Sequence, residues 1–164
     1  MIFSKLLRFS LKTFFFIFLI TFFVFAAAYA TYSFEKQSFL NKISKDSKVL
    51  KTDLGEIEYK IYDGGKEEIL HIHGTPGGFD QIFGIETKYK VINPSRPGYL
   101  RTPIDSGQTP EQQADLYNAL LNELGINSVF VMGTSGGGPS AIAFAIKYPE
   151  KTRGLISFEA LTGP

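Results

Sequence analysis

The hydrophobic and polar positions divide the chain into an apolar N-terminal run and a longer region of short, alternating elements. Residues 13–34 contain no charged side chain. From about residue 53 onward, short apolar runs bounded by glycine and proline alternate with stretches that carry an apolar stripe at helical spacing. Strands that alternate with helices predict a mostly parallel α/β sheet with helices on both faces. Sites in such sheets lie at the carboxyl ends of the strands.

The apolar run predicts a helix long enough to cross a bilayer. At ~1.5 Å per residue, a helix over 13–34 spans the ~30 Å hydrocarbon layer. Lys5, Arg8 and Lys12 precede it, so residues 1–12 are expected to be a basic cytoplasmic region. The length favours a single-pass anchor with the globular part extracytoplasmic. The alternative is a signal peptide cleaved near Ala30, which would leave a secreted or periplasmic protein.

Residues 35–52 are polar and rich in lysine, and they are expected to form a linker or a short surface helix. Lysines on this side of the apolar run weaken the assignment of its orientation. A partial globular domain is expected over 53–164.

Several elements of that domain have specific signals. Ile57, Tyr59 and Ile61 alternate with Glu58 and Lys60, which predicts a strand with the charged residues facing solvent. Further strands are expected near 69–73, 89–92, 129–132 and 155–158. A helix should begin after Thr109, with Pro110 in its first turn and Gln112 completing a capping box, and end at Gly125. A second helix should run from about 139 to 148.

The segment 129–139 carries the most informative chemistry. A buried strand is followed by Gly-Thr-Ser-Gly-Gly at 133–137 and then by a helix, the context in which a serine stands exposed at the apex of a sharp turn. Ser135 is therefore the candidate nucleophile. A phosphate-binding loop is the alternative, because the glycine spacing fits, but Pro139 stands where that motif requires lysine.

The loop 73–78, His-Gly-Thr-Pro-Gly-Gly, ends another predicted strand. Acyl transfer needs two donors for the oxyanion of the tetrahedral intermediate. The Gly136 amide would be one donor. Thr75 is the candidate for the other, because Pro76 has no N–H. His73 is expected to shape the loop rather than to act as a base.

From about residue 53 to its end, the chain resembles the α/β-hydrolase fold proteins, close to the proline-iminopeptidase and esterase branch. The resemblance rests on the loop 73–78, Ser-Arg-Pro-Gly-Tyr at 95–99, the turn at 133–137 and Tyr148-Pro149-Glu150. It implies a serine hydrolase acting on a small-molecule ester or amide, with Ser135 as nucleophile and the Gly136 and Thr75 amides as oxyanion hole. The family places its acid and histidine after the nucleophile.

Both histidines of this chain precede Ser135, and Glu159 has no histidine after it to orient. The chain is therefore expected to be a truncated fragment of a membrane-anchored hydrolase that lacks the catalytic acid and histidine. A non-catalytic, membrane-tethered binding protein and a decayed gene product are the alternatives.

Composition narrows the remaining classes. The net charge of +1 argues against a nucleic-acid partner, and the absence of cysteine excludes disulfides and thiolate metal sites. Neither a metal site nor an organic cofactor is predicted. The sequence does not indicate the oligomeric state.

Overall fold

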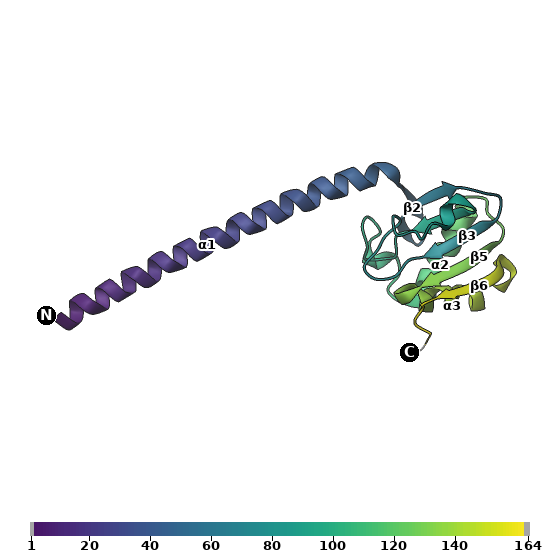
Figure 1. Ribbon diagram of the computed structural model, residues 1–164. Helices are drawn as coiled ribbons and strands as arrows, with labels where there is room; N and C mark the ends of the chain where they lie inside the picture. The colour runs from purple at the N-terminus through teal and green to yellow at the C-terminus, as the bar shows by residue number, and fades with distance from the viewer. Residues whose placement is uncertain (1, 163–164) are drawn as a thin grey trace. The chain divides into compact units, whose positions relative to one another are not determined.

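A computed structural model describes the backbone of residues 2–162 and the side chains from Lys12 onward. The chain divides into two compact units, Met1–Lys42 and Ile43–Pro164 (Figure 1). The first unit is a helix, and the second contains the sheet. The apolar run and the α/β domain expected from the sequence thus correspond to separate bodies.

Helix α1 (Ile2–Ile43) contains the whole predicted apolar span. Between Lys12 and Asp46 the mean hydropathy reaches 2.3, and none of that stretch is buried. The helix is long and apolar enough to cross a membrane or to belong to a signal sequence. It also continues through residues 35–43 of the expected linker.

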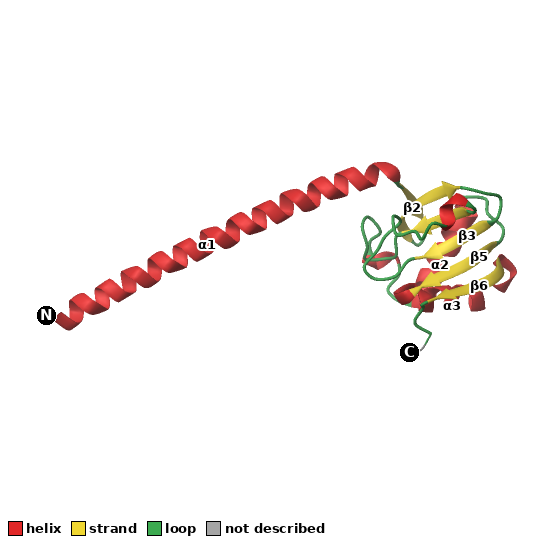
Figure 2. Ribbon diagram, viewed as in Figure 1, coloured by secondary structure: helices red, strands yellow, loops and turns green. Residues whose placement is uncertain are grey.

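The domain is built on a six-stranded sheet in the order β1-β2-β4-β3-β5-β6. Figure 2 labels four of these strands, β2, β3, β5 and β6. Its strands are β1 (Lys48–Thr52), β2 (Gly55–Asp63), β3 (Glu68–Ile72), β4 (Lys90–Pro94), β5 (Val129–Thr134) and β6 (Thr152–Phe158). Four neighbouring strands, β4, β3, β5 and β6, run parallel, as predicted. Strands β1 and β2 are antiparallel, so residues 48–52 of the expected linker belong to the sheet.

Helices α2 (Pro110–Glu123) and α3 (Gly138–Lys147) share one apolar core with alternate residues of the strands. The capping box expected at the start of α2 is present: the Thr109 side chain accepts from the Gln112 amide, and the Gln112 side chain accepts from the Thr109 amide. Leu116, Leu120 and Val131 are among the fully buried residues of this core.

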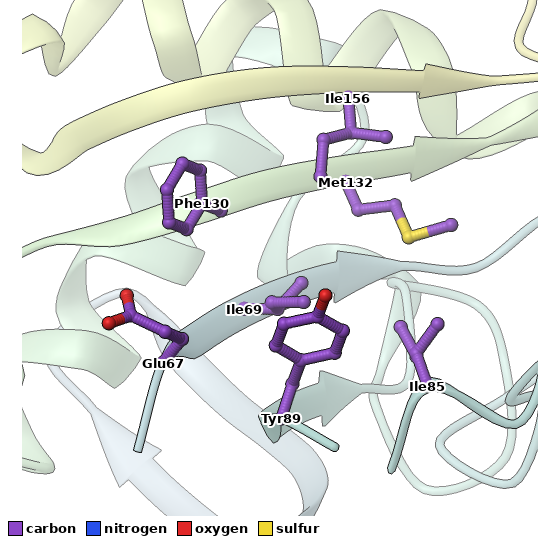
Figure 3. Close-up of a pocket in the computed structure, with 7 residues that line it drawn as sticks. All are labelled: Glu67, Ile69, Ile85, Tyr89, Phe130, Met132 and Ile156. Atoms are coloured by element: carbon purple, nitrogen blue, oxygen red, sulfur yellow. The ribbon is translucent and has the colours of Figure 1, made fainter. Parts of the chain in front are cut away.

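The opposite face of the sheet is covered by the loop after β3, which includes the 3-10 turn η2 (Ile85–Thr87). Among the described residues, α2 and α3 pack into the same core, so the expectation of α-helices on both faces is met on one face only. A cavity of about 640 Å³ remains on the loop-covered face (Figure 3). It is lined by Glu67, Ile69, Ile85, Tyr89, Phe130, Met132 and Ile156.

Strand β2 corrects one expectation about side chains. Glu58, expected to face solvent, is 1% exposed. Its carboxylate accepts from Arg101 Nε at 2.7 Å, from the Arg101 amide at 3.0 Å and from Ser47 Oγ at 2.7 Å. The Glu58–Arg101 ion pair thus connects the sheet to the segment that follows α1.

Candidate active site

The turn between β5 and α3 places Ser135 in a strained backbone conformation. Ser135 has φ 47°, a left-handed value that residues with a side chain rarely adopt. The chain passes from β5 through the 3-10 turn η4 (Ser135–Gly137) into α3. This strand, sharp turn and helix match the geometry predicted around the candidate nucleophile.

The glycines beside Ser135 leave no room for a side chain. A Cβ added at Gly133 would lie 2.6 Å from Ala141 Cβ, and one added at Gly137 would lie 2.2 Å from the carbonyl oxygen of Ile72. Helix α3 can pack closely on β5, and the turn on β3, because these two positions carry only hydrogen. The sequence pattern therefore has a steric cause.

The loop 73–78 lies against this turn. A Cβ added at Gly74 would lie 2.9 Å from Ser135 Cβ, and one added at Gly136 would lie 3.1 Å from Thr75 Oγ1. The loop is held in place by Gln81, whose Oε1 accepts from the Gly74 amide at 2.7 Å. The structure thus brings together Ser135, Gly136 and Thr75, the three residues predicted to form the site.

His73 lies beside the site, but both of its ring nitrogens are engaged. The Arg96 amide donates to Nε2 at 2.8 Å, so the proton is on Nδ1, which donates to the Gly74 carbonyl at 2.7 Å. Burial lowers the pKa of His73 to about 4. These bonds agree with the expectation that His73 shapes the loop, because neither nitrogen can accept a proton from Ser135.

His71, two residues earlier in the chain, also has both ring nitrogens hydrogen-bonded. Its Nδ1 lies 3.1 Å from Asn93 Oδ1 and its Nε2 lies 3.0 Å from Thr134 Oγ1. The Asn93 amide nitrogen donates to two carbonyls, so its oxygen is left to accept from the imidazole. Burial lowers the pKa of His71 to about 4. This ring links β3, β4 and β5 as a neutral group.

The segment after β6 also reaches the turn. The Leu161 amide donates to the Ser135 carbonyl at 3.0 Å. Glu159, which ends this approach from β6, has φ 47° and an exposed side chain. Nothing in the sequence predicted the left-handed backbone of Glu159.

Arg96 is a neighbour of the site that the sequence did not single out. A Cβ added at Gly136 would lie 3.2 Å from Arg96 Nη1. This nitrogen is buried and has no hydrogen-bond partner among the described residues. Arginine in a loop is ordinarily a surface residue, so its sequence position gave no signal of this environment.

Among the described side chains, no group of three or more His, Cys, Asp and Glu residues could hold a metal ion.

Comparison with known proteins agrees with the fold. Residues 69–163 match the family model described as the alpha/beta hydrolase fold. An uncharacterized hydrolase of Bacillus subtilis, YcgS, is 40% identical over 114 residues, which are 67% of this chain and 40% of that protein. A Klebsiella pneumoniae 2-hydroxy-6-oxononadienedioate/2-hydroxy-6-oxononatrienedioate hydrolase is 28% identical over 133 residues, covering 71% of this chain and 46% of that enzyme.

Solved structures give the same result. An alpha/beta hydrolase fold protein from Nakamurella multipartita has a TM-score of 0.63 at 37% identity, covering 70% of this chain and 41% of that one. The N-acyl homoserine lactonase AidH has a TM-score of 0.60 at 29% identity, covering 70% of this chain and 44% of that one. This chain thus spans less than half the length of these relatives. With its strand order, its strained serine turn and a family match over residues 69–163, the chain belongs to the α/β-hydrolase fold family.

Proposed function

We propose that this chain carries the nucleophile and oxyanion hole of a serine hydrolase that cleaves a small-molecule ester, lactone or amide bond. Ser135 is the nucleophile, and the amides of Gly136 and Thr75 bind the oxyanion of the tetrahedral intermediate. The observation that supports this most directly is the backbone φ of 47° at Ser135, which lies beside Gly74 of the loop 73–78. A lactonase among the similar structures supports the substrate class.

Each residue has a defined role in the proposed reaction. Ser135 Oγ attacks the carbonyl carbon, and the two amides stabilise the negative charge that develops on the carbonyl oxygen. The first turn of α3 favours that charge as well, because its amides point toward the turn. A general base must accept the Ser135 proton.

Neither histidine of this chain suits that role, because both rings are buried, neutral and hydrogen-bonded on each side. We therefore propose that the base and its carboxylate belong to polypeptide outside residues 1–164. The lengths of the relatives, of which this chain spans 40% and 46%, support that view.

We also propose that residues 13–34 anchor the chain in a membrane, with the α/β domain on the extracytoplasmic side. Three cations near the N-terminus support this orientation, since basic residues flanking a span remain cytoplasmic. Cleavage near Ala30 would instead release the domain.

A fluorophosphonate probe tests the nucleophile. Applied to membranes of the native cells, it should label the protein at Ser135, and Ser135→Ala should abolish labelling. Ser157→Ala is the matched control, because Ser157 is an exposed serine on β6 and its loss should leave labelling unchanged. Labelled protein should have an intact mass above 18.3 kDa, the mass of this chain. A native protein of that mass without labelling would contradict catalysis and favour a binding role.

A further inference from the structure

Arg96 carries a positive charge that the surrounding protein does not neutralise. Among the described residues, none of the ion pairs includes Arg96. The Nη1 atom is buried without a hydrogen-bond partner. The side chain as a whole is only partly buried, but its buried Nη1 donor has lost hydration without gaining a partner, which is costly. A site that binds an anion would supply one.

The neutral groups around the guanidinium satisfy it poorly. Arg96 Nε lies 3.5 Å from Gln113 Oε1, at the limit of a hydrogen bond. The same oxygen already accepts from Ser140 Oγ at 2.6 Å and faces the Tyr117 hydroxyl at 3.4 Å. A carbonyl oxygen has two lone pairs, so three donors cannot all be served well. The Tyr117 hydroxyl also interacts with the guanidinium, and the centroid of the Tyr99 ring lies 5.6 Å from Arg96 Cζ.

This charge lies directly beside the proposed oxyanion hole. The position of a Cβ on Gly136 is 3.2 Å from Arg96 Nη1 and 3.1 Å from Thr75 Oγ1. A guanidinium nitrogen and a hydroxyl therefore lie beside Gly136. The Thr75 hydroxyl is 2.8 Å from the Tyr99 hydroxyl, and this pair is exposed. An anion at the Gly136 amide would not have to contact Nη1, since attraction between charges extends over several ångströms.

We propose that Arg96 makes this end of the sheet a binding site for a carboxylate, and that the substrate of the enzyme carries one near its scissile bond. The inference rests on the proposed function for its location, but it concerns ligand recognition rather than bond cleavage. Arg96 acts here as a specificity residue: its charge selects an anionic ligand over a neutral one of the same shape.

Propionate and propionamide, which differ mainly in charge, are the probes for this site. Each is titrated into the full-length protein in detergent at constant ionic strength, and binding is followed by the amide NMR shifts of Thr75 and Gly136. We expect propionate to bind about tenfold more tightly than propionamide. Arg96→Gln should remove that difference, and Arg96→Lys should retain part of it.

Two control variants separate the possible explanations. Arg153→Gln also removes one positive charge, but at the exposed side of the sheet, so propionate affinity should not change. Ser157→Ala, at an exposed position on β6, should bind propionate as the wild type does. If the fluorophosphonate test fails while this pattern holds, the nucleophile is wrong and the anion site remains. Equal affinities of the wild type for the two probes, no shift of either amide, or unchanged selectivity in a folded Arg96→Gln variant would each overturn the proposal.

Discussion

At the scale of single residues, the two imidazole rings act as fixed neutral links. Burial lowers the pKa of His71 and of His73 to about 4, against 6.5 in the unfolded chain. We expect neither ring to titrate between pH 8 and pH 5. The measurement is direct, because the chain has two histidines and their ring-proton NMR signals can be followed with pH.

The same shifts predict how the stability of the fold depends on pH. Below pH 6.5 the unfolded chain binds protons at both histidines, and the folded chain does not until pH is about 4. Stability is thus fully present above pH 6.5 and falls between pH 6.5 and 4, by up to roughly 3 kcal/mol per ring. A midpoint of ring titration near 6.5 for either histidine would contradict this account.

Gly137 makes the closest backbone approach of the turn. Its substitution by alanine would place Cβ 2.2 Å from the Ile72 carbonyl oxygen, so strands and turn would have to separate. We expect Gly137→Ala to lower the free energy of unfolding by about 3 kcal/mol or more, toward the upper end for overpacked sites. Chemical denaturation of the full chain in detergent, followed by circular dichroism, measures the change.

Gly84 provides the matched control. It has φ 78°, and a Cβ there would meet no atom within 4 Å. Gly84→Ala should therefore cost only the left-handed backbone penalty of about 1 to 2 kcal/mol. If the two alanine variants were equally stable, close packing would not be the reason for glycine at 137.

At the scale of elements, the Glu58–Arg101 pair joins three segments. Arg101 bonds Glu58 on β2, and its Nη2 donates to the Ser44 carbonyl at 3.2 Å and to Ser47 Oγ at 2.7 Å. Arg101→Met should destabilise the domain by about 3 kcal/mol, because it leaves a buried carboxylate without its counter-charge.

The pair Lys51–Glu56 is the control for this prediction. Its side chains are 82% and 43% exposed, so Lys51→Met should change stability by less than about 1 kcal/mol. Thermal unfolding of both variants compares them. Similar losses would show that the buried pair has no special role.

The sequence predicts the elements that have local signals. The capping box at Thr109 and the turn at Ser135 depend on residues close together in the chain, and both are present. Strand β1 could not be predicted, because its lysine-rich segment becomes a strand only by pairing with β2. The burial of Glu58 depends on Arg101, 43 residues later. The surroundings of the Arg96 side chain likewise depend on segments that are distant in the chain.

At the scale of the whole molecule, the chain consists of an apolar helix, α1, and a mixed α/β domain. Strand β6 lies at the edge of the sheet, and Leu155, Ile156 and Phe158 on it are 40% to 43% exposed. An exposed apolar edge is prone to associate with other chains. Detergent should therefore be needed to keep the domain, as well as the helix, from associating in solution.

The proposed anchor predicts the behaviour of the protein in cell fractions. The native protein should stay with the membrane after alkaline carbonate extraction and should retain residues 1–30 in its intact mass. Val24→Arg places a charge in the middle of the span, at a cost of about 2.5 to 3.5 kcal/mol of insertion, and should shift protein to the soluble fraction. Lys36→Arg, outside the span, should leave fractionation unchanged. Loss of residues 1–30 would identify a cleaved signal.

The bonds from Arg101 to Ser44 and Ser47 also have a mechanical consequence. Tension on the chain at the end of α1 would reach the domain at Ile43, just before these two serines. Arg101 would pass the load to Glu58 on β2, so the pull would be shared by the sheet instead of peeling β1 from its edge. Arg101 would thus help to keep strand β1 paired with the sheet under load. Single-molecule pulling should therefore show a lower first rupture force for Arg101→Met.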